Sequence, residues 1–150
     1  MKVVLQRVTK ATITIDNTTT KNIDKGLVIL LGVCESDTLE DAKLLAKKCS
    51  ELRIFNDEND KLNLSANDLN LDCLIVSNFT LYADTKKGRR PSFIKAAKEP
   101  LSIDAYNLFI EESKKYNYKN VVSGKFGADM QINLINDGPV TIVMDTNDWK

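Results

Sequence analysis

The stretch Gly26-Leu-Val-Ile-Leu-Leu-Gly-Val33 is a continuous apolar run bounded by glycine. A short run without a polar position is typical of a β-strand that is buried on both of its faces. Residues 71–76 predict a second buried strand, which leads directly into Ser77. The architecture expected from these strands is a single mixed α/β domain over residues 1–150, in which helices cover part of the sheet surface.

Apolar residues that alternate with polar ones predict further strands. Residues 3–8 and 11–15 form two such segments near the N-terminus, and the second shows a period of two. Residues 130–135 and 140–144 form two more, with Asn136-Asp-Gly-Pro139 between them. Because these are typical turn residues, we expect the segment to join the two strands as a turn.

Helical spacing of apolar residues predicts the covering helices. Asp37 has the position of an N-cap, and Glu40 three residues later completes a capping box, so a helix is expected over 38–52. A short helix is expected over 92–98, and Ser102 is expected to cap a second long helix.

The composition excludes several classes of protein. The 150 residues suit one domain, and a hydrophobic content of 43% supports a real core. The 21 basic and 21 acidic residues give a net charge of zero, which argues against a protein that coats nucleic acid without specificity. No apolar run is long enough to span a membrane, and the N-terminal residues do not resemble a signal peptide, so we expect a cytoplasmic protein with no membrane partner.

The chain has no histidine, and its three cysteines, Cys34, Cys49 and Cys73, are widely spaced. We interpret the cysteines as buried, reduced thiols. Without histidine or a cysteine pair there is no zinc site of the usual kind, and we expect neither a metal nor a cofactor. Any hydrolytic chemistry must therefore work without the most common general base.

Ser77-Asn78-Phe79-Thr80-Leu81 follows the second buried strand. A strand that ends in a tight polar segment leaves backbone N–H groups without ladder partners, and such donors can hold a developing oxyanion. Ser77 and Thr80 add hydroxyls that can orient a substrate or a water. The alternative is an ordinary strand end whose hydroxyls bond nearby backbone groups, and the residues alone favour it. A serine nucleophile is disfavoured because no histidine is present to activate Ser77.

Gly138-Pro139 lies in the predicted turn near the C-terminus. Proline is disfavoured in a central strand, so a plain turn is the ordinary interpretation. The functional interpretation is a rigid element that displays its carbonyl groups. The composition does not decide between the two.

Lys86, Lys87, Arg89 and Arg90 place four cations within five residues. Such a cluster can clamp a phosphate, as a contact that positions nucleic acid without reading its bases. The ordinary interpretation is a solvated loop. A net charge of zero makes this local cluster more informative than it would be in a basic protein.

Phe126 lies between glycines in Gly124-Lys-Phe-Gly-Ala-Asp-Met130. An aromatic side chain in a surface loop can stack on a nucleobase, which is worth about 1–3 kcal/mol. Phe126 and Met130 can equally well pack in the core. The segment lacks the spacing of a phosphate-binding P-loop.

Together these segments resemble the D-aminoacyl-tRNA deacylase family, and the resemblance covers essentially the whole chain. The matching stretches are Val4-Leu-Gln-Arg-Val8, Leu52-Arg-Ile-Phe55, Ser77-Asn-Phe-Thr-Leu-Tyr-Ala-Asp84, Lys87-Gly-Arg-Arg-Pro-Ser-Phe93, Phe126-Gly-Ala-Asp-Met130 and Asn136-Asp-Gly-Pro-Val-Thr141. The ordered set is highly specific, although no single stretch is. The resemblance implies a three-layer α/β/β fold and a homodimer that hydrolyses the ester between a D-amino acid and the 3′ end of tRNA.

The resemblance also implies roles for individual residues. The segment from Ser77 to Thr80 would form the floor of an active site at the dimer interface. Gly138-Pro139, with a cis peptide bond, would enter the pocket of the other subunit as a chirality filter, and Arg7 would fix its orientation across the dimer. Phe126 and Met130 would line the pocket for the terminal adenosine.

The family's usual glutamine is replaced here by Asn78, which is one methylene shorter. We expect this replacement to have a mild effect on activity if the site relies on the N–H groups of Phe79 and Thr80.

An aminoacyl ester is reactive, so modest oxyanion stabilisation is sufficient, and a ribose hydroxyl of the tRNA can assist the attack of water. The preferred mechanism is therefore attack by water with assistance from the RNA hydroxyl. The alternative mechanism uses the Thr80 hydroxyl as the nucleophile.

Two other functions compete with this one. A non-catalytic module would bind nucleic acid through the basic loop and Phe126, and a general esterase would use Ser77. The absence of histidine makes the esterase the weakest hypothesis. A filter that works only by excluding an L side chain cannot exclude glycine, so we also expect hydrolysis of glycyl-tRNA.

Overall fold

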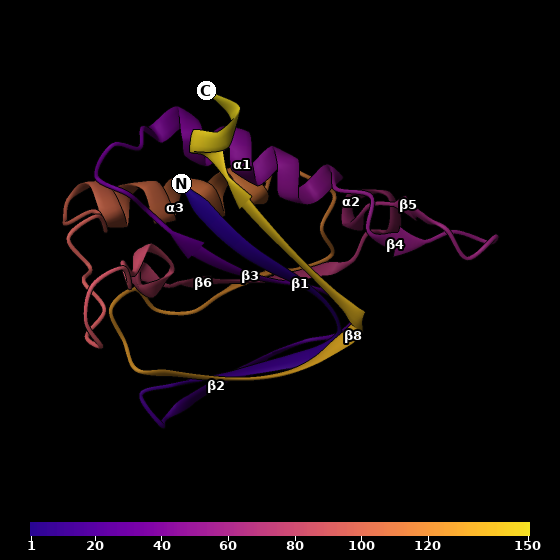
Figure 1. The fold of residues 1–150 in the computed structure, drawn as a ribbon. Coiled ribbons are helices and arrows are strands. Elements are labelled where there is room, and N and C mark those ends of the chain that lie inside the picture. Colours follow the sequence, from indigo (N-terminus) through magenta and orange to yellow (C-terminus); the bar gives the residue numbers. More distant parts are fainter.

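The computed structural model describes residues 1–150 and contains one mixed six-stranded sheet (Figure 1). Its strand order is β2-β1-β3-β6-β7, with β8 paired to β1. The strands are β1 (Lys2–Ile15), β2 (Thr19–Ile23), β3 (Gly26–Gly32), β6 (Asp72–Ser77), β7 (Val121–Ser123) and β8 (Met130–Asp145). The central pairs β3–β6 and β6–β7 are parallel, whereas β1 runs antiparallel to β2, β3 and β8.

The sheet forms two layers because β1 and β8 bend together. The first half of β1 pairs with β3, its second half pairs with β2, and both halves pair with β8. The register between β1 and β8 shifts between Gln6 and Val8 and again between Val8 and Ala11. Bulges of this kind bend a strand pair. Figure 1 shows the result, with β2 and the start of β8 lying below β3 and β6.

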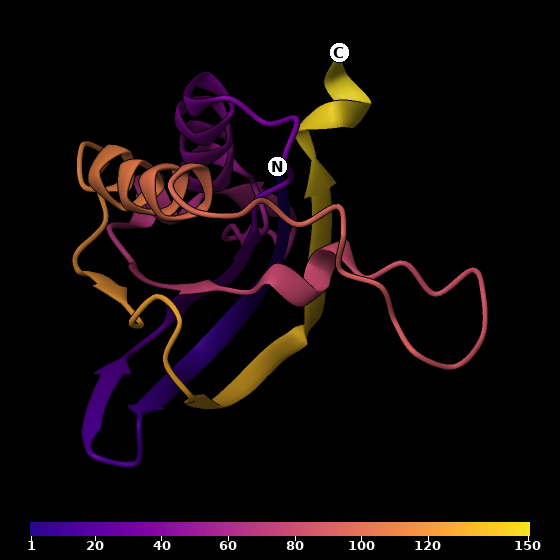
Figure 2. The same cartoon turned by 90° about the vertical axis from the view of Figure 1, so that its left-hand side faces the viewer.

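Helices cover the other face of β3 and β6. The two long ones are α1 (Leu39–Glu51) and α3 (Leu101–Ser113). The short elements are β4 (Phe55–Asn56), β5 (Leu62–Leu64), α2 (Ala66–Leu69) and the 3₁₀ helices η1 (Phe79–Tyr82) and η2 (Thr146–Trp149). The predicted three-layer α/β/β architecture is therefore confirmed (Figures 1 and 2). No helix is long and apolar enough to cross a membrane.

Two cores account for the continuous apolar run in β3. Leu27, Ile29 and Leu31 belong to a large core shared with α1 and α3, while Val28 belongs to a second core between the sheet layers. The second core consists of Val8, Ala11, Ile13, Ile15, Ile23, Val28, Leu74 and Val76. Because successive residues of a strand face opposite sides, both layers require apolar residues here.

Two of the three cysteines are buried as predicted. Cys49 and Cys73 lie in the large core, where burial raises the pKa of each thiol. Cys34 is partly exposed, so the prediction that it is buried was wrong. All three are free thiols.

The prediction of a turn at Asn136-Asp-Gly-Pro139 was wrong. β8 is one strand over Met130–Asp145, and its two halves pair with the same partner, β1. The segment is therefore an irregularity within a continuing strand. Bulges and turns use the same glycine, proline, asparagine and aspartate residues, so local composition does not distinguish them.

The predicted helix caps were also displaced. Thr38 is the N-cap of α1, and the Asp41 carboxylate accepts a hydrogen bond from the Thr38 backbone N–H at 2.8 Å. The Asp37 carboxylate is occupied elsewhere, because it accepts from the Cys34 backbone N–H at 2.7 Å and pairs with the buried N-terminal amine. The N-terminal amine is 36 residues away in sequence, so the local sequence around Asp37 does not reveal this partner.

The predicted short helix over 92–98 does not form. The segment consists of turns and isolated bridges, with Ser92 paired to Asp84 and Ala96 paired to Cys34. Pro100 is the N-cap of α3, so Ser102 lies inside the first turn of that helix and does not cap it.

We predict that Gly26→Ala strongly destabilises the fold. A Cβ at this position would lie 1.9 Å from the backbone oxygen of Asp72 on the neighbouring strand. Because this neighbour is backbone in a packed core, the expected loss in the free energy of unfolding is about 3 kcal/mol or more. Urea unfolding measures the loss.

The matched control is Gly88→Ala. A Cβ at Gly88 meets nothing within 4 Å, but the residue has a φ of +67°. The expected loss in the free energy of unfolding is therefore only about 1–2 kcal/mol, which is the cost of a left-handed backbone conformation for an L residue. Equal losses for the two variants would contradict the close packing of β3 on β6.

Candidate active site

The carboxyl end of β6 turns sharply into η1. Ser77 is opposite Leu31 in the parallel pair, and the Asn78 backbone N–H donates to the Leu31 oxygen at 2.8 Å. The turn lies close against β3, since a Cβ at Gly32 would be 3.1 Å from Leu81 Cβ and 3.2 Å from the Asn78 oxygen. A glycine at the end of the apolar run therefore allows η1 to pack there.

The two predicted oxyanion donors differ in their bonding. The Phe79 backbone N–H donates to no acceptor within the chain. The Thr80 backbone N–H donates to Asn78 Oδ1 at 3.2 Å, and the Thr80 hydroxyl donates to the same oxygen at 2.5 Å. Asn78 is the N-cap of η1 and holds both polar groups of Thr80. One donor is thus free, and the other is occupied by a side chain.

A small cavity of about 50 Å³ lies behind this turn. It is lined by residues from β3, β6, η1, α3, the segments next to them and the loop after β7, namely Leu31, Val33, Ser77, Asn78, Phe79, Ala97, Ser102, Tyr106 and Phe126. The fold therefore brings Phe126 to Ser77, Asn78 and Phe79, although it is far from them in sequence.

Tyr106 and Phe126 form an aromatic wall of the cavity. Their ring centroids are 5.7 Å apart, and the Tyr106 hydroxyl donates to the Ile75 backbone oxygen at 3.3 Å. Burial raises the pKa of Tyr106 to about 12, so the hydroxyl remains a donor at neutral pH. The bond ties α3 to β6 two residues before Ser77. Tyr106 was not among the residues that the sequence predicted for the site.

Met130 lies apart from this cavity. It is partly buried against the core between the sheet layers, and its sulfur would be 2.5 Å from a Cβ at Gly124. Of the two residues that the resemblance assigned to the adenosine pocket, only Phe126 lines the cavity. Met130 instead fills the space beside the loop that carries Phe126.

Arg7 holds the Gly138-Pro139 segment of its own chain. Arg7 Nε donates to the Asp137 backbone oxygen at 3.1 Å, and Nη1 donates to the Ile54 oxygen at 2.9 Å. The Arg7 residue is only 8% exposed. The Gly138–Pro139 bond is cis, and Gly138 has a φ of +128°, which L residues rarely adopt. In the single chain, Arg7 acts within its own subunit.

The Gly138-Pro139 segment is remote from Ser77 within one chain. β8, β1, β3 and β6 are successive neighbours, and Arg7 is opposite Leu27, whereas Ser77 is opposite Leu31. Three strand spacings and four residues correspond to roughly 20 Å on standard strand geometry. One chain therefore does not combine the two elements into a single site.

The basic loop projects from the body of the domain (Figure 2). Its four cations, Lys86, Lys87, Arg89 and Arg90, are exposed, and none forms an ion pair within the chain. Cations left without carboxylate partners remain available to an anion from outside.

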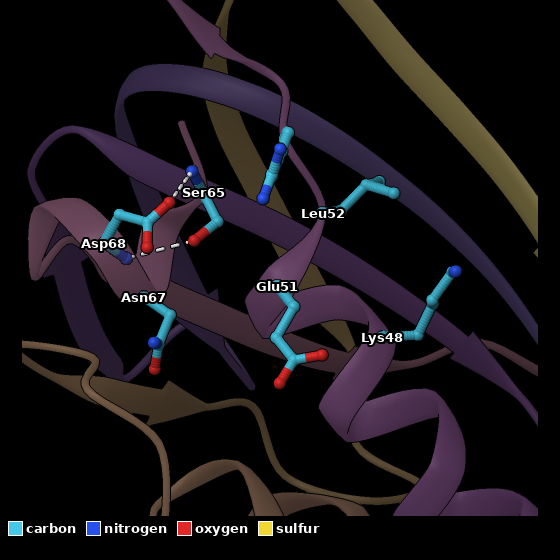
Figure 3. A pocket seen from close by; sticks show the side chains of 7 residues that line it. Lys48, Glu51, Leu52, Ser65, Asn67 and Asp68 are labelled. Atoms are coloured by element: carbon cyan, nitrogen blue, oxygen red, sulfur yellow. Dashed lines mark hydrogen bonds between the residues drawn. The ribbon is translucent and has the colours of Figure 1, made fainter. Parts of the chain in front are cut away.

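A larger polar hollow of about 540 Å³ lies between the end of α1 and α2 (Figure 3). Figure 3 shows Ser65 and Asp68 bonded to each other, and these bonds form the capping box of α2. The backbone N–H of Ser65 also lowers the pKa of Asp68. Lys48 and Arg53 are balanced by Glu51 and Asp68. These groups are explained by helix capping and charge balance, so the turn at Ser77 is the better candidate.

Comparison with known proteins identifies the family of the chain. Residues 4–145 match the family model described as D-Tyr-tRNA(Tyr) deacylase. The chain belongs to this family. The D-aminoacyl-tRNA deacylases of Flavobacterium johnsoniae and Thermosipho africanus are each 49% identical to it over 146 residues, with 97% of each chain covered.

Solved structures share the fold of this deacylase-family member. The structure titled "c-Myc DNA Unwinding Element Binding Protein" is 38% identical, with a TM-score of 0.89 and coverage of 97% of this chain and 98% of that one. A probable eukaryotic D-amino acid tRNA deacylase has a TM-score of 0.85 at 16% identity, covering 95% of this chain and 97% of that one. The second likeness concerns the fold alone.

We predict that Asn78→Ala lowers the free energy of unfolding by about 1 kcal/mol, because the cap of η1 is lost. Urea unfolding measures the change. Asn107→Ala, at an exposed position inside α3, is the control and should be neutral or slightly stabilising. An unchanged stability for Asn78→Ala would contradict a capping role for this side chain.

Proposed function

We propose that the chain hydrolyses the ester linking a D-amino acid to the 3′ end of tRNA, releasing the free amino acid and tRNA. The enzyme class follows from membership in the deacylase family. The observation that supports this site is the free Phe79 N–H, which lies at a strand end beside an aromatic cavity.

In the proposed mechanism the main chain stabilises the transition state. As water attacks the ester carbonyl, negative charge develops on its oxygen, and the Phe79 N–H donates to it. The Thr80 N–H becomes a second donor when it leaves Asn78 Oδ1. The neighbouring ribose hydroxyl of the tRNA assists the water, so the protein supplies no histidine. The Ser77 hydroxyl orients the reacting groups, while the Thr80 hydroxyl stays bonded to Asn78 Oδ1.

The terminal adenosine would occupy the mouth of the cavity. Phe79 is 59% exposed at this mouth, and Phe126 forms the wall behind it. Aromatic faces of this kind stack on nucleobases. Asn78 lies at the same mouth, and Met130 contributes indirectly by supporting the loop that carries Phe126.

A second copy of the chain would complete the site. Its Gly138-Pro139 segment would enter the pocket and crowd the position of an L side chain, as a chirality filter that Arg7 holds in place. The remoteness of this segment from Ser77 in one chain supports the homodimer. The exposed rings of Phe79 and Phe93, whose centroids are 5.1 Å apart, also support it, because exposed apolar patches mark contact surfaces.

The basic loop would hold the tRNA backbone. Lys86, Lys87, Arg89 and Arg90 are unpaired and project away from the domain, which suits a positioning contact with phosphates. Such a contact adds affinity that falls with salt and does not depend on the amino acid.

The main test compares deacylation of D-Tyr-tRNA, L-Tyr-tRNA and glycyl-tRNA by the purified chain in the presence of a chelator. We expect rapid loss of the D ester and hydrolysis of the glycyl ester. The L ester should persist, because its side chain meets the filter. Release of the amino acid measures the reaction, and light scattering on the same preparation should give the mass of a dimer.

Several outcomes would contradict parts of this proposal. Intact D-Tyr-tRNA retained by the protein would indicate a binding module without catalysis. A monomeric mass in an active preparation would refute the cross-subunit filter, and complete resistance of glycyl-tRNA would contradict its steric basis.

Thr80→Ala separates the two mechanisms. If the tRNA hydroxyl assists the water, we expect nearly full activity, because the backbone N–H of residue 80 remains. A loss of several orders of magnitude in the single-turnover rate would favour the Thr80 hydroxyl as the nucleophile. Ser113→Ala, in α3 and away from the cavity, is the control for an unspecific effect of removing a hydroxyl.

A further inference from the structure

Ser102 differs from the other buried serines of the chain. Four serines are more than nine-tenths buried. In three of them the hydroxyl is hydrogen-bonded: Ser50 Oγ donates to the Lys47 oxygen at 2.8 Å, Ser65 Oγ accepts from the Asp68 N–H at 3.0 Å, and Ser113 Oγ donates to the Phe109 oxygen at 2.7 Å. The Ser102 hydroxyl has no hydrogen-bond partner in the chain, although 8% exposure leaves little room for bulk water. Buried polar groups normally have partners.

The Ser102 hydroxyl is also not sealed inside the protein. Two side-chain polar groups are fully enclosed and have no hydrogen-bond partner, the hydroxyls of Tyr82 and Tyr118. The Ser102 hydroxyl is not one of them, so it is not fully enclosed. Ser102 lines the same cavity as Ser77 and Phe126, from the first turn of α3. Its hydroxyl therefore has access to this cavity and to whatever enters it.

We propose that Ser102 is a substrate-binding residue whose hydroxyl hydrogen-bonds the edge of the terminal nucleobase of the tRNA. This inference rests on the proposed function, which brings that base to the cavity. The cavity of about 50 Å³ has the volume of one or two water molecules, so it admits an edge of a flat ring and not the whole ring.

The chemistry of the cavity suits the edge of an adenine. Tyr106 and Phe126 provide aromatic contact area. Stacking of a base on an aromatic ring does not depend on which base it is. A serine hydroxyl can both donate and accept. An adenine edge presents an amino donor next to a ring nitrogen acceptor, so one hydroxyl can satisfy either group.

Kinetics of Ser102→Ala test the proposal with the full-length chain and D-Tyr-tRNA. We expect KM to rise roughly 3- to 10-fold, the effect of one hydrogen bond, with a smaller change in kcat. The melting temperature should stay within about a degree, because no bond within the protein is lost. Ser113→Ala is the matched control in the same helix. Losing its bond to Phe109 should lower the melting temperature and leave KM unchanged.

A purely structural role would reverse this pattern. A lowered melting temperature with an unchanged KM for Ser102→Ala would overturn the proposal. So would an unchanged KM at an unchanged melting temperature, which would leave water as the partner of the hydroxyl.

Binding of base analogues identifies the contact independently of catalysis. The probes are a non-hydrolysable 3′-(D-tyrosylamino)-3′-deoxyadenosine and its counterparts that lack the exocyclic amine, N1 or N7 of the base. In the wild-type protein at least one counterpart should bind more weakly by calorimetry, and Ser102→Ala should abolish that difference. If Ser102→Ala weakens the binding of all four ligands equally, the proposed contact with the base edge is overturned.

The two experiments separate this inference from the proposed function. A wild-type protein that does not hydrolyse D-Tyr-tRNA but shows the Ser102-dependent preference among analogues would refute the function and support the contact. Active hydrolysis with no effect of Ser102→Ala would support the function and refute the contact.

Discussion

β3 and β6 are buried on both faces, and the other elements are arranged to cover them. On one side, α1 and α3 complete a large core with Leu27, Ile29 and Leu31. On the other side no helix is available, so the sheet covers itself by bending β1 and β8 and adding β2. The bulges near Val8 are thus a consequence of the need to bury Val28, Leu74 and Val76.

The same constraint locates the candidate site. The rigid parallel pair β3–β6 ends at Ser77, where the chain must leave the sheet within a crowded space. Gly32 allows η1 to pack there, and Asn78 caps it. The helix layer reaches the same end through Tyr106, which bonds to the strand at Ile75. Donors at the turn are therefore held from two layers, which is the arrangement that electrostatic preorganisation requires.

Sequence patterns predicted those features that a single stretch of chain determines. The apolar runs identified β3 and β6 because a strand buried on both faces has no polar position. The motif around Ser77 indicated the candidate site through the family resemblance. The bulge at Asn136-Asp-Gly-Pro139 was taken for a turn, since its residues suit both. Asp37 was taken for a helix cap because its charged partner, the N-terminal amine, is brought to it only by folding. Ser102 carried no local signal of its missing partner.

The free donor at Phe79 belongs to the main chain, and this affects how the site can change over time. Every residue except proline carries a backbone N–H, so ordinary substitutions at this position alter the side chain and leave the donor in place. The chemistry would then depend on the path of the backbone more than on which amino acids line it. Mutations that move the turn, far from any reacting atom, would harm such a site more than many replacements within it.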